Sequence, residues 1–219
     1  MDRPTETLAG DRLRLIDCGI ADYGAALHQQ LELHSGRLAG LIPDTVLICE
    51  HPPVITLGAR KAANKLLVSP GHIAGQGIGL VEVTRGGGTT AHNPGQLVVY
   101  PILSLKERGI SAGQYVRTLE AIGLGLLQDL GLQAQTRHGL PGLWVEDRKI
   151  ASIGVRISKG ITFHGMAVNI QNDLRIFDLF VPCGLDGVHM TSLLRETGKA
   201  CPMACARDKA AQWLIRYLS

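Results

Sequence analysis

Residues 142–170 read Gly142-Leu-Trp-Val145, Glu146-Asp-Arg148, Lys149-Ile-Ala-Ser-Ile-Gly-Val-Arg-Ile157, Ser158-Lys-Gly160 and Ile161-Thr-Phe-His-Gly-Met-Ala-Val-Asn-Ile170. The three apolar runs are rich in residues that favour strands. The two short polar segments between them fit hairpin turns. Because hairpins join antiparallel neighbours, we expect this stretch to form three antiparallel strands.

Helical patterns occur on both sides of this stretch. One helix is expected from Ala21 to about Gly40, with a stripe of Tyr23, Leu27, Leu31, His34 and Leu38. The clearest helix follows Ser111, whose capping box with Gln114 precedes an apolar stripe that ends at Gly131. A third lies at the end of the chain, where the stripe is Ala206, Ala210, Trp213, Leu214 and Tyr217.

Shorter apolar runs supply the remaining strands. They are Thr45-Val-Leu-Ile-Cys49 and Val54-Ile-Thr-Leu57, and the polar, glycine-rich residues 59–78 after them predict a loop. Helices and strands do not alternate regularly along the chain. The sequence therefore predicts an α+β fold with a mixed, mostly antiparallel sheet and flanking helices.

Composition bounds the size of the protein and its classes of partner. The chain fits one domain, residues 1–219, and a hydrophobic fraction of 45% is ample for a core. A net charge of +3 gives no reason to expect a nucleic-acid partner. No apolar run reaches the ~20 residues that span a bilayer, and the N-terminus has no signal-peptide pattern, so we expect no membrane partner. The five scattered cysteines indicate free thiols and a cytoplasmic location.

A polar, glycine-rich segment is the strongest candidate for a binding site. Arg85-Gly-Gly-Gly-Thr-Thr-Ala-His-Asn-Pro-Gly-Gln96 lies between the apolar runs Gly79–Val83 and Leu97–Ile102, as binding loops commonly do. It lacks the Gly-Lys-Ser/Thr of a Walker A loop, and its glycines are contiguous, unlike those of a dinucleotide-binding fingerprint. A glycine-rich hairpin would explain the glycines, but not Arg85, His92 and Gln96 together.

Two residues outside this loop are candidates for covalent chemistry. Cys183 stands between Pro182 and Gly184 in a loop that gives its sulfur little steric cover. Lys149 shares its parity with the apolar residues of its strand, so it points to the buried face if the strand has no bulge. From the residues alone, a packed cysteine and a strand-edge lysine that reaches water are the favoured explanations. His92 and His164 have polar, glycine-bearing neighbours, yet a lone strand histidine is more often structural.

Five ordered motifs together resemble the lipoyl(octanoyl) transferase family. They are His51-Pro-Pro-Val-Ile-Thr-Leu-Gly58, Arg85 to Gln96, Arg148-Lys-Ile-Ala-Ser-Ile-Gly154, Phe163-His-Gly-Met-Ala-Val-Asn169 and Val181-Pro-Cys-Gly-Leu185. The resemblance implies a fold shared with biotin and lipoate protein ligases and a catalytic pair, Cys183 and Lys149. It also implies substrate contacts at Arg85, Gly86, Gly87, Gly88, Thr89, Thr90, Ala91, His92, Ser152, Ile153, Gly154, Gly165, Met166 and Ala167. One departure is Asn93, where the family usually has glycine; we expect a small change in pocket shape.

The same resemblance implies an activity. Such an acyltransferase moves an octanoyl or lipoyl group from acyl carrier protein to a lysine of a lipoyl domain, through a thioester on cysteine. The acceptors would be lipoyl domains of 2-oxoacid dehydrogenase complexes and the glycine cleavage H protein, and no metal or other cofactor is expected. Three alternatives stay open: an ATP-dependent lipoate-protein ligase, a non-catalytic acyl-binding protein and a thiol hydrolase that releases free octanoate.

Overall fold

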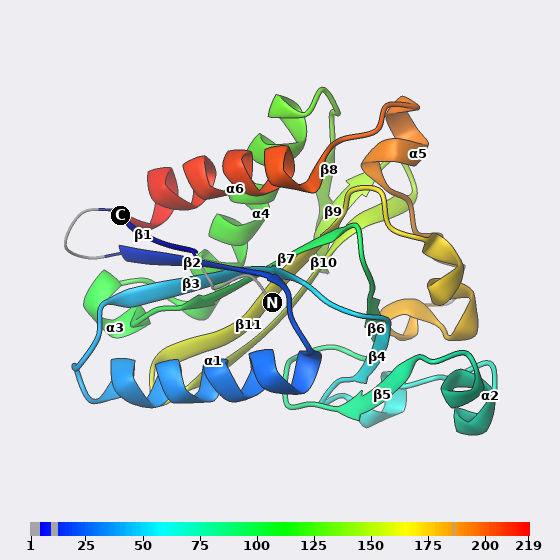
Figure 1. Ribbon diagram of the computed structural model, residues 1–219, viewed down its shortest axis with the longest axis horizontal. Coiled ribbons are helices and arrows are strands. Elements are labelled where there is room, and N and C mark those ends of the chain that lie inside the picture. The colour runs from blue at the N-terminus through cyan, green and yellow to red at the C-terminus, as the bar shows by residue number, and fades with distance from the viewer. Residues whose placement is uncertain (1–4, 10–12, 186) are drawn as a thin grey trace.

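A long, twisted sheet forms the centre of the molecule (Figure 1). The computed structural model describes residues 5–9, 13–185 and 187–219, without the side chains of residues 5, 7–9 and 183. The sheet has eight strands in the order β1-β2-β3-β7-β11-β10-β9-β8. They are β1 (Thr5–Ala9), β2 (Leu13–Ile20), β3 (Asp44–Glu50), β7 (Gln96–Ile102), β8 (Gln135–Arg137), β9 (Leu140–Val145), β10 (Arg148–Ser158) and β11 (Ile161–Asn169). Among the described strands of this sheet, β2 and β3 pair in parallel and all other neighbours are antiparallel, so the mostly antiparallel prediction is confirmed.

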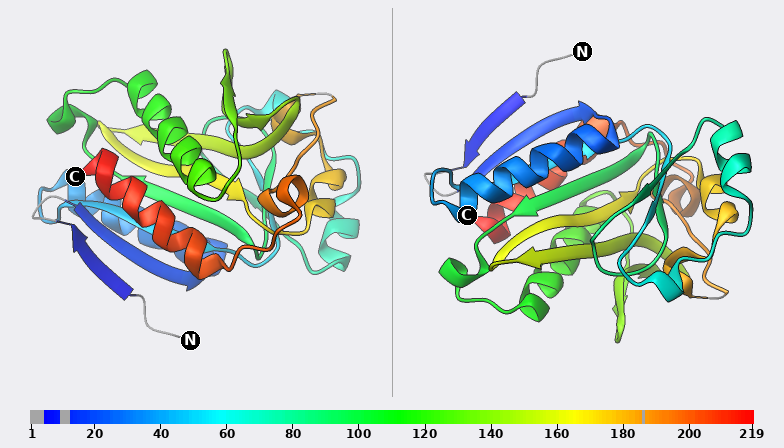
Figure 2. Two further views of the ribbon diagram at one scale, coloured as in Figure 1. Left: turned by 90° about the horizontal axis from the view of Figure 1, so that it is seen from above. Right: turned by 90° about the horizontal axis from the view of Figure 1, so that it is seen from below.

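Helices cover both faces of this sheet (Figure 2). One face carries α1 (Tyr23–Leu38), and the other carries α4 (Ala112–Asp129) and α6 (Met203–Leu218). The predicted capping box of Ser111 with Gln114 begins α4. Short helices α3 (Leu105–Arg108) and α5 (Leu193–Thr197) lie in connections. Among the described residues, none of the helices combines the length and apolarity needed to cross a bilayer.

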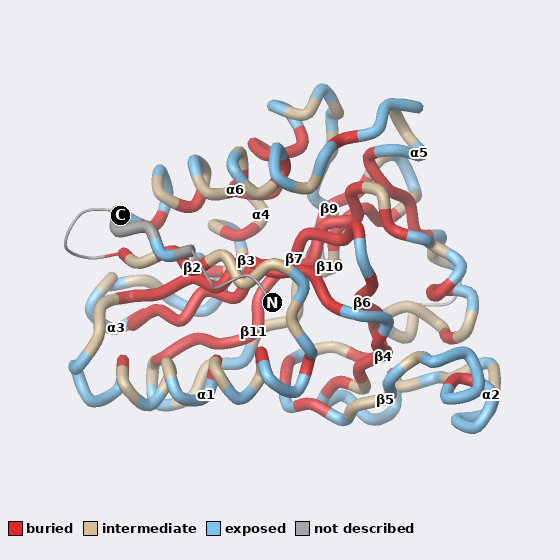
Figure 3. The backbone as a smooth tube through the Cα atoms, in the orientation of Figure 1, coloured by how far each residue is buried: buried red, intermediate tan, exposed pale blue. Residues whose placement is uncertain are grey.

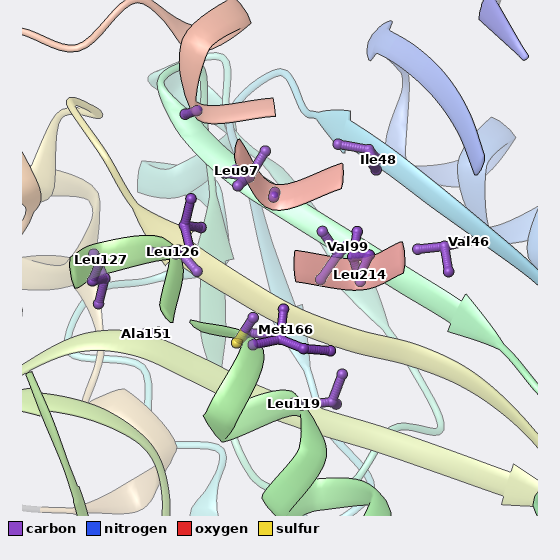
Figure 4. Close-up of a cluster of buried hydrophobic side chains, with 14 of the residues drawn as sticks. Val46, Ile48, Leu97, Val99, Leu119, Leu126, Leu127, Ala151, Met166 and Leu214 are labelled. Atoms are coloured by element: carbon purple, nitrogen blue, oxygen red, sulfur yellow. The ribbon is translucent and has the colours of Figure 1, made fainter. Parts of the chain in front are cut away.

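The main core lies between the central sheet and the pair α4 and α6 (Figure 4). Leu119 and Leu126 of α4 and Leu214 of α6 meet Val99 of β7 and Met166 of β11, all almost fully buried. Complete burial of such a side chain stabilises the fold by about 1.5–3 kcal/mol. The central strands are accordingly the most buried part of the backbone tube in Figure 3.

The buried face of α1 differs from the predicted stripe. Leu31 and Leu38 are 46% and 42% exposed, whereas Gln30 and Arg37 are buried. Arg37 can be buried because its Nε donates to Asp44 Oδ1 at 2.6 Å. The hydrophobic spacing located the helix, but buried polar partners set its rotation.

A second, smaller sheet lies at one end of the molecule, in the order β5-β4-β6. It consists of β4 (Val54–Leu57), β5 (Gly79–Glu82) and β6 (Thr90–His92). Around it lie the 3₁₀ helices η1 (Lys61–Ala63), η2 (Leu174–Leu179) and η3 (Pro182–Gly184), and α2 (Pro70–Gly75). Residues 59–78 are therefore not one loop, because they contain η1 and α2. The strand β6 falls inside the glycine-rich segment. Of the two apolar runs that flank the segment, the one in β7 is buried and the one in β5 is only partly covered.

The hairpin of β10 and β11 positions the site. Its turn places Lys159 and Gly160 at φ angles of 50° and 81°, in the left-handed region that two-residue hairpin turns require. The pairing runs in register from Ala151 opposite Val168 to Ser158 opposite Ile161. All three predicted antiparallel strands of residues 142–170 are present as β9, β10 and β11.

Candidate functional site

A pocket lies where the glycine-rich segment covers the central sheet. Its walls come from α1, from residues 85–89 (the glycine loop), and from β6, β7, β10 and β11. Of the predicted substrate contacts, the structure brings together Arg85, Gly86, Gly87, Thr90, His92, Ser152, Ile153, Gly154, Gly165, Met166 and Ala167. The floor is β10 and β11, where Gly154 pairs with Gly165 and Ser152 pairs with Ala167. The three segments that hold these predicted contacts, residues 85–92, 152–154 and 165–167, therefore line one cavity.

The glycine loop is held by its own arginine. Arg85 is 6% exposed, and its guanidinium donates to Gly88 O at 2.8 Å, to Thr56 O at 2.9 Å and to Thr56 Oγ1 at 2.6 Å. A Cβ on Gly154 would lie 3.0 Å from the Arg85 side chain, so the loop packs directly on β10. Gly86 N also donates to Val155 O at 2.9 Å. Arg85 thus fixes the loop over the strand while its side chain lines the pocket.

Three of the predicted contacts do not line the pocket. Thr89 is fully buried, with its hydroxyl 3.4 Å from Asn64 Oδ1. Ala91 packs in the separate apolar cluster around Ile55 and Phe177. A Cβ on Gly88 would lie 2.7 Å from the Cβ of Ala63, so Gly88 packs against η1. These three residues pack on neighbouring parts of the protein instead of the pocket, and they fix the shape of the loop.

Aromatic and imidazole rings in contact with one another form part of the pocket wall. Tyr23, Val98, Tyr100 and His164 line it in addition to the predicted residues. Sequence reasoning missed Tyr23, Val98 and Tyr100 as site residues because α1 and β7 reach the pocket only through long-range packing. The alternation of Val98 and Tyr100 on one face of β7 was the available signal. His164, which the sequence favours as a structural histidine, lies in the pocket wall.

Hydrogen bonds fix the tautomers of two histidines here. His92 Nδ1 lies 2.7 Å from Gln96 Oε1, an acceptor, so Nδ1 carries the proton. His51 Nδ1 likewise donates to Ala21 O at 2.8 Å, and its Nε2 accepts from the Tyr100 hydroxyl at 2.8 Å. Burial lowers the pKa of His51, and burial followed by the neighbouring His51 holds the pKa of His92 well below its usual value. His92 is therefore neutral at pH 7, with a lone pair on Nε2.

Lys149 lies at the beginning of β10 and is 3% exposed. Its ammonium is 5.3 Å from the centre of the Trp144 ring, at cation–π distance. A β-bulge separates Lys149 from Ala151, so the unbulged strand assumed from the sequence is wrong although the residue is buried. The strand-edge explanation, a lysine that reaches into water, does not describe this side chain.

The position of Lys149 is set by its backbone and by a glycine. Lys149 N donates to His189 O at 2.8 Å, and its carbonyl accepts from Thr191 N at 2.9 Å. A Cβ on Gly142 would lie 2.7 Å from Lys149 Cε and 3.3 Å from Nζ. Gly142 is the register partner of Ser152, so the lysine side chain runs along the sheet toward the pocket floor.

Cys183 belongs to the 3₁₀ turn η3. Its side chain is outside the described part of the structure, so its distance from Lys149 stays a prediction. The backbone around it is described. Val181 N donates to Lys65 O at 2.9 Å, and a Cβ on Gly184 would lie 2.7 Å from the Cβ of Ala63. Because Gly88 packs on the same Ala63, the turn that carries Cys183 lies against the base of the glycine loop.

Solved structures share this fold. A lipoate-protein ligase A bound with ATP superposes with a TM-score of 0.69 at 16% identity, covering 94% of this chain and 85% of that one. LipL1 of P. falciparum in complex with lipoate has a TM-score of 0.73 at 12% identity, and the match covers 95% of this chain and 62% of that one. The biotin protein ligase of Aquifex aeolicus gives 0.52 at 12% identity, covering 95% and 69%. The predicted biotin and lipoate ligase-like fold is confirmed.

Sequence relatives are much closer. The octanoyltransferase of Syntrophobacter fumaroxidans is 44% identical over 185 residues, covering 84% of this chain and 81% of that protein. The octanoyltransferase of Roseiflexus sp. is 42% identical over 200 residues, and the match covers 90% of this chain and 83% of that protein. The family model of the lipoyl protein ligase A/B catalytic domain matches residues 22–215. The chain belongs to this catalytic-domain family, and the two sequence relatives named above are octanoyltransferases.

Proposed function

We propose that this protein is an acyltransferase that moves an octanoyl group from octanoyl-acyl carrier protein to a lysine of a lipoyl domain. The observation that carries the proposal is the pocket between the glycine loop and β10–β11, in a chain 44% identical to an octanoyltransferase. Its wall of Val98, Ile153, Met166, Ala167 and glycine backbone suits an acyl chain. Residues 1–219 would act as one catalytic domain.

The proposed reaction has two steps. In the first, the Cys183 thiolate attacks the carbonyl carbon of the thioester, and the carrier's phosphopantetheine thiolate leaves and takes up a proton. In the second, the ε-amine of the acceptor lysine attacks the new thioester on Cys183, loses a proton and forms an amide, which restores the thiol. A covalent intermediate lets two protein partners use one site in turn.

Lys149 is proposed as the partner of Cys183. Its ammonium would stabilise the Cys183 thiolate and protonate the leaving thiolate of the carrier, and the resulting amine would then accept a proton from the attacking lysine. Support comes from its burial and from the backbone hydrogen bonds that tie it to the segment 189–191. Backbone N–H groups of the glycine loop are candidates for holding the oxyanion.

A trapping experiment tests the covalent step. We expect incubation with octanoyl-acyl carrier protein, without acceptor, to add one octanoyl group to the intact protein in mass spectrometry. Cys183→Ala should abolish this adduct and Lys149→Ala should slow it strongly. Cys205→Ala, which removes an exposed free thiol, is the control for non-specific acylation and should react normally. Full transfer activity in Cys183→Ala would refute the mechanism.

An ATP-dependent lipoate ligase is the second candidate, because ligases share the fold. Their identity of 12–16% supports the fold alone, whereas the octanoyltransferases reach 44%. Replacing the acyl carrier substrate with free octanoate and MgATP decides between them: a ligase forms octanoylated lipoyl domain, and the proposed transferase does not. A non-catalytic acyl-binding protein would yield no product with either donor.

The acceptors and the compartment are part of the proposal. We expect lipoyl domains of 2-oxoacid dehydrogenase complexes and the glycine cleavage H protein to accept the acyl group. A cytoplasmic location fits the four described cysteines, which are free thiols. Transfer assays with each purified acceptor would rank them.

A further inference from the structure

His164 has a backbone conformation that strands rarely contain. It lies inside β11 with a φ angle of 55°, in the left-handed region that a non-glycine residue adopts at a cost. Its N–H donates to Oε1 of Gln30, a fully buried side chain of α1, at 2.8 Å. A buried hydrogen bond from the facing helix therefore holds this conformation.

The unusual φ angle changes the face on which the imidazole lies. In a regular strand, Phe163 and His164 would point to opposite faces. Here their rings stack with centroids 5.0 Å apart, and the His164 ring meets Tyr100 edge-on at 6.5 Å. The ring consequently lines the pocket.

The nitrogens of this ring lack partners within the pocket walls. His164 is 1% exposed, and neither Nδ1 nor Nε2 has a hydrogen bond to any described residue. Burial, with Arg85 and Arg156 nearby, lowers the pKa of His164 to about 4, so the ring is neutral at pH 7. A neutral imidazole has one donor and one acceptor, and leaving both unpaired costs stability. The site is therefore built for something polar that the protein itself does not supply.

Register gives the place of His164 along the pocket. Lys149 Cε and Nζ lie beside Gly142, which pairs with Ser152. His164 pairs with Val155, three positions further along β10, or roughly 10 Å at the rise of a strand. An extended chain of eight carbons has a similar length. The wall between the two ends includes Ile153 and Ala167.

We propose that His164 is a specificity-determining residue that forms a polar end to the acyl slot and limits the chain to about eight carbons. This inference rests on the proposed function. A chain of that length leaves the ring nitrogens free to bind water, whereas a longer chain covers them with methylene groups. The polar end therefore disfavours longer acyl chains even where the surrounding side chains could move.

The test compares donors that carry hexanoyl, octanoyl, decanoyl and dodecanoyl groups on acyl carrier protein. The wild type should show the highest kcat/KM with octanoyl. His164→Ala should raise the decanoyl-to-octanoyl ratio of kcat/KM by about tenfold or more, the range for one or two methylenes in an apolar pocket. His164→Asn keeps a polar group and tolerates the left-handed φ, so it should retain the preference for octanoyl.

A matched control is His34→Ala. His34 meets Phe163 edge-on at 5.3 Å and contacts Ser158 O, but it does not line the pocket. Its chain-length profile should equal that of the wild type. An unchanged profile in an active His164→Ala variant, or equal relaxation in His164→Asn and His164→Ala, would overturn the role of His164. Should His164→Ala not fold, the role of His164 would also be overturned if His164→Asn transferred dodecanoyl as fast as octanoyl. An inactive wild type would instead refute the proposed function.

Discussion

The side-chain amides of Gln96 and Asn169 are hydrogen-bonded to each other at 2.9 Å, although 73 positions separate them. Gln96 also accepts from His92 Nδ1 at 2.7 Å, and Asn169 donates to Thr191 O at 2.9 Å. Thr191 N in turn donates to Lys149 O at 2.9 Å. One buried chain of hydrogen bonds therefore joins the imidazole of the pocket to the backbone of the proposed catalytic lysine.

Asn169→Leu tests this chain. The substitution leaves Gln96 Nε2 without one of its acceptors and Thr191 O without its donor, at about 1–3 kcal/mol for each unpaired group. We expect a lower free energy of unfolding, and kcat reduced roughly ten- to a hundredfold because Lys149 shifts. Asn169→Asp keeps the acceptor toward Gln96 and should retain more activity. Denaturant unfolding and steady-state kinetics measure both effects, and wild-type kcat in Asn169→Leu would contradict the proposed coupling.

Gly142→Ala should displace the lysine directly. Gly142 has a φ angle of 126°, and an added Cβ would contact the Ala151 carbonyl and lie 2.7 Å from Lys149 Cε. We expect the rate of Cys183 acylation to fall by roughly ten- to a hundredfold. Gly139→Ala is the matched control: its φ angle is 75°, but a Cβ there meets nothing within 4 Å. An equal fall of the acylation rate in both variants would show that backbone strain, not the lysine, causes it.

The sequence predicted the strands of the site better than the residues that complete it. The turns at Glu146–Arg148 and Ser158–Gly160 and the apolar runs between them predicted β9, β10 and β11, because hairpins are encoded locally. Tyr23 and Tyr100 reach the pocket through packing of α1 and β7 on β11, which no local pattern records. The alternation of residues along β10 predicts the direction of Lys149 only for a strand without a bulge, and the structure has one there. Alternation along β11 also does not predict that the His164 side chain turns onto the pocket face.

Stability should fall as the solution becomes acidic. Burial lowers the pKa of His164 to about 4, and those of His51 and His92 are also lowered. An unfolded histidine has a pKa near 6.5, so below that pH the unfolded chain binds more protons than the folded chain. The free energy of unfolding should therefore decrease between about pH 6.5 and pH 4, by up to about 1.4 kcal/mol per pH unit for each histidine.

Urea unfolding at pH 7, 6 and 5 measures this slope. His164→Asn should reduce it by the contribution of one histidine, because the variant has no titrating ring at this position. His28→Asn, which removes an exposed histidine, is the matched control for the substitution itself. A slope that His164→Asn does not alter would mean that folding does not lower the pKa of His164.

Ala63 is the contact between the glycine loop and the turn of Cys183. Added Cβ atoms on Gly88 and Gly184 would each lie 2.7 Å from the Cβ of Ala63, so this methyl group fills the space between them. Ala63→Val adds two methyl groups where the neighbours are backbone, and overpacking of this kind costs about 1–3 kcal/mol. Because Gly184 follows Cys183 directly, relief of the clash should move the proposed nucleophile away from the pocket. We expect the octanoyl adduct to form more slowly, as monitored by stopped-flow mass spectrometry. The binding of free octanoate should change little.

Ala62→Val, in the same 3₁₀ helix but exposed, is the matched control and should react like the wild type. Equal adduct rates in the two variants would show that the contact at Ala63 does not position Cys183.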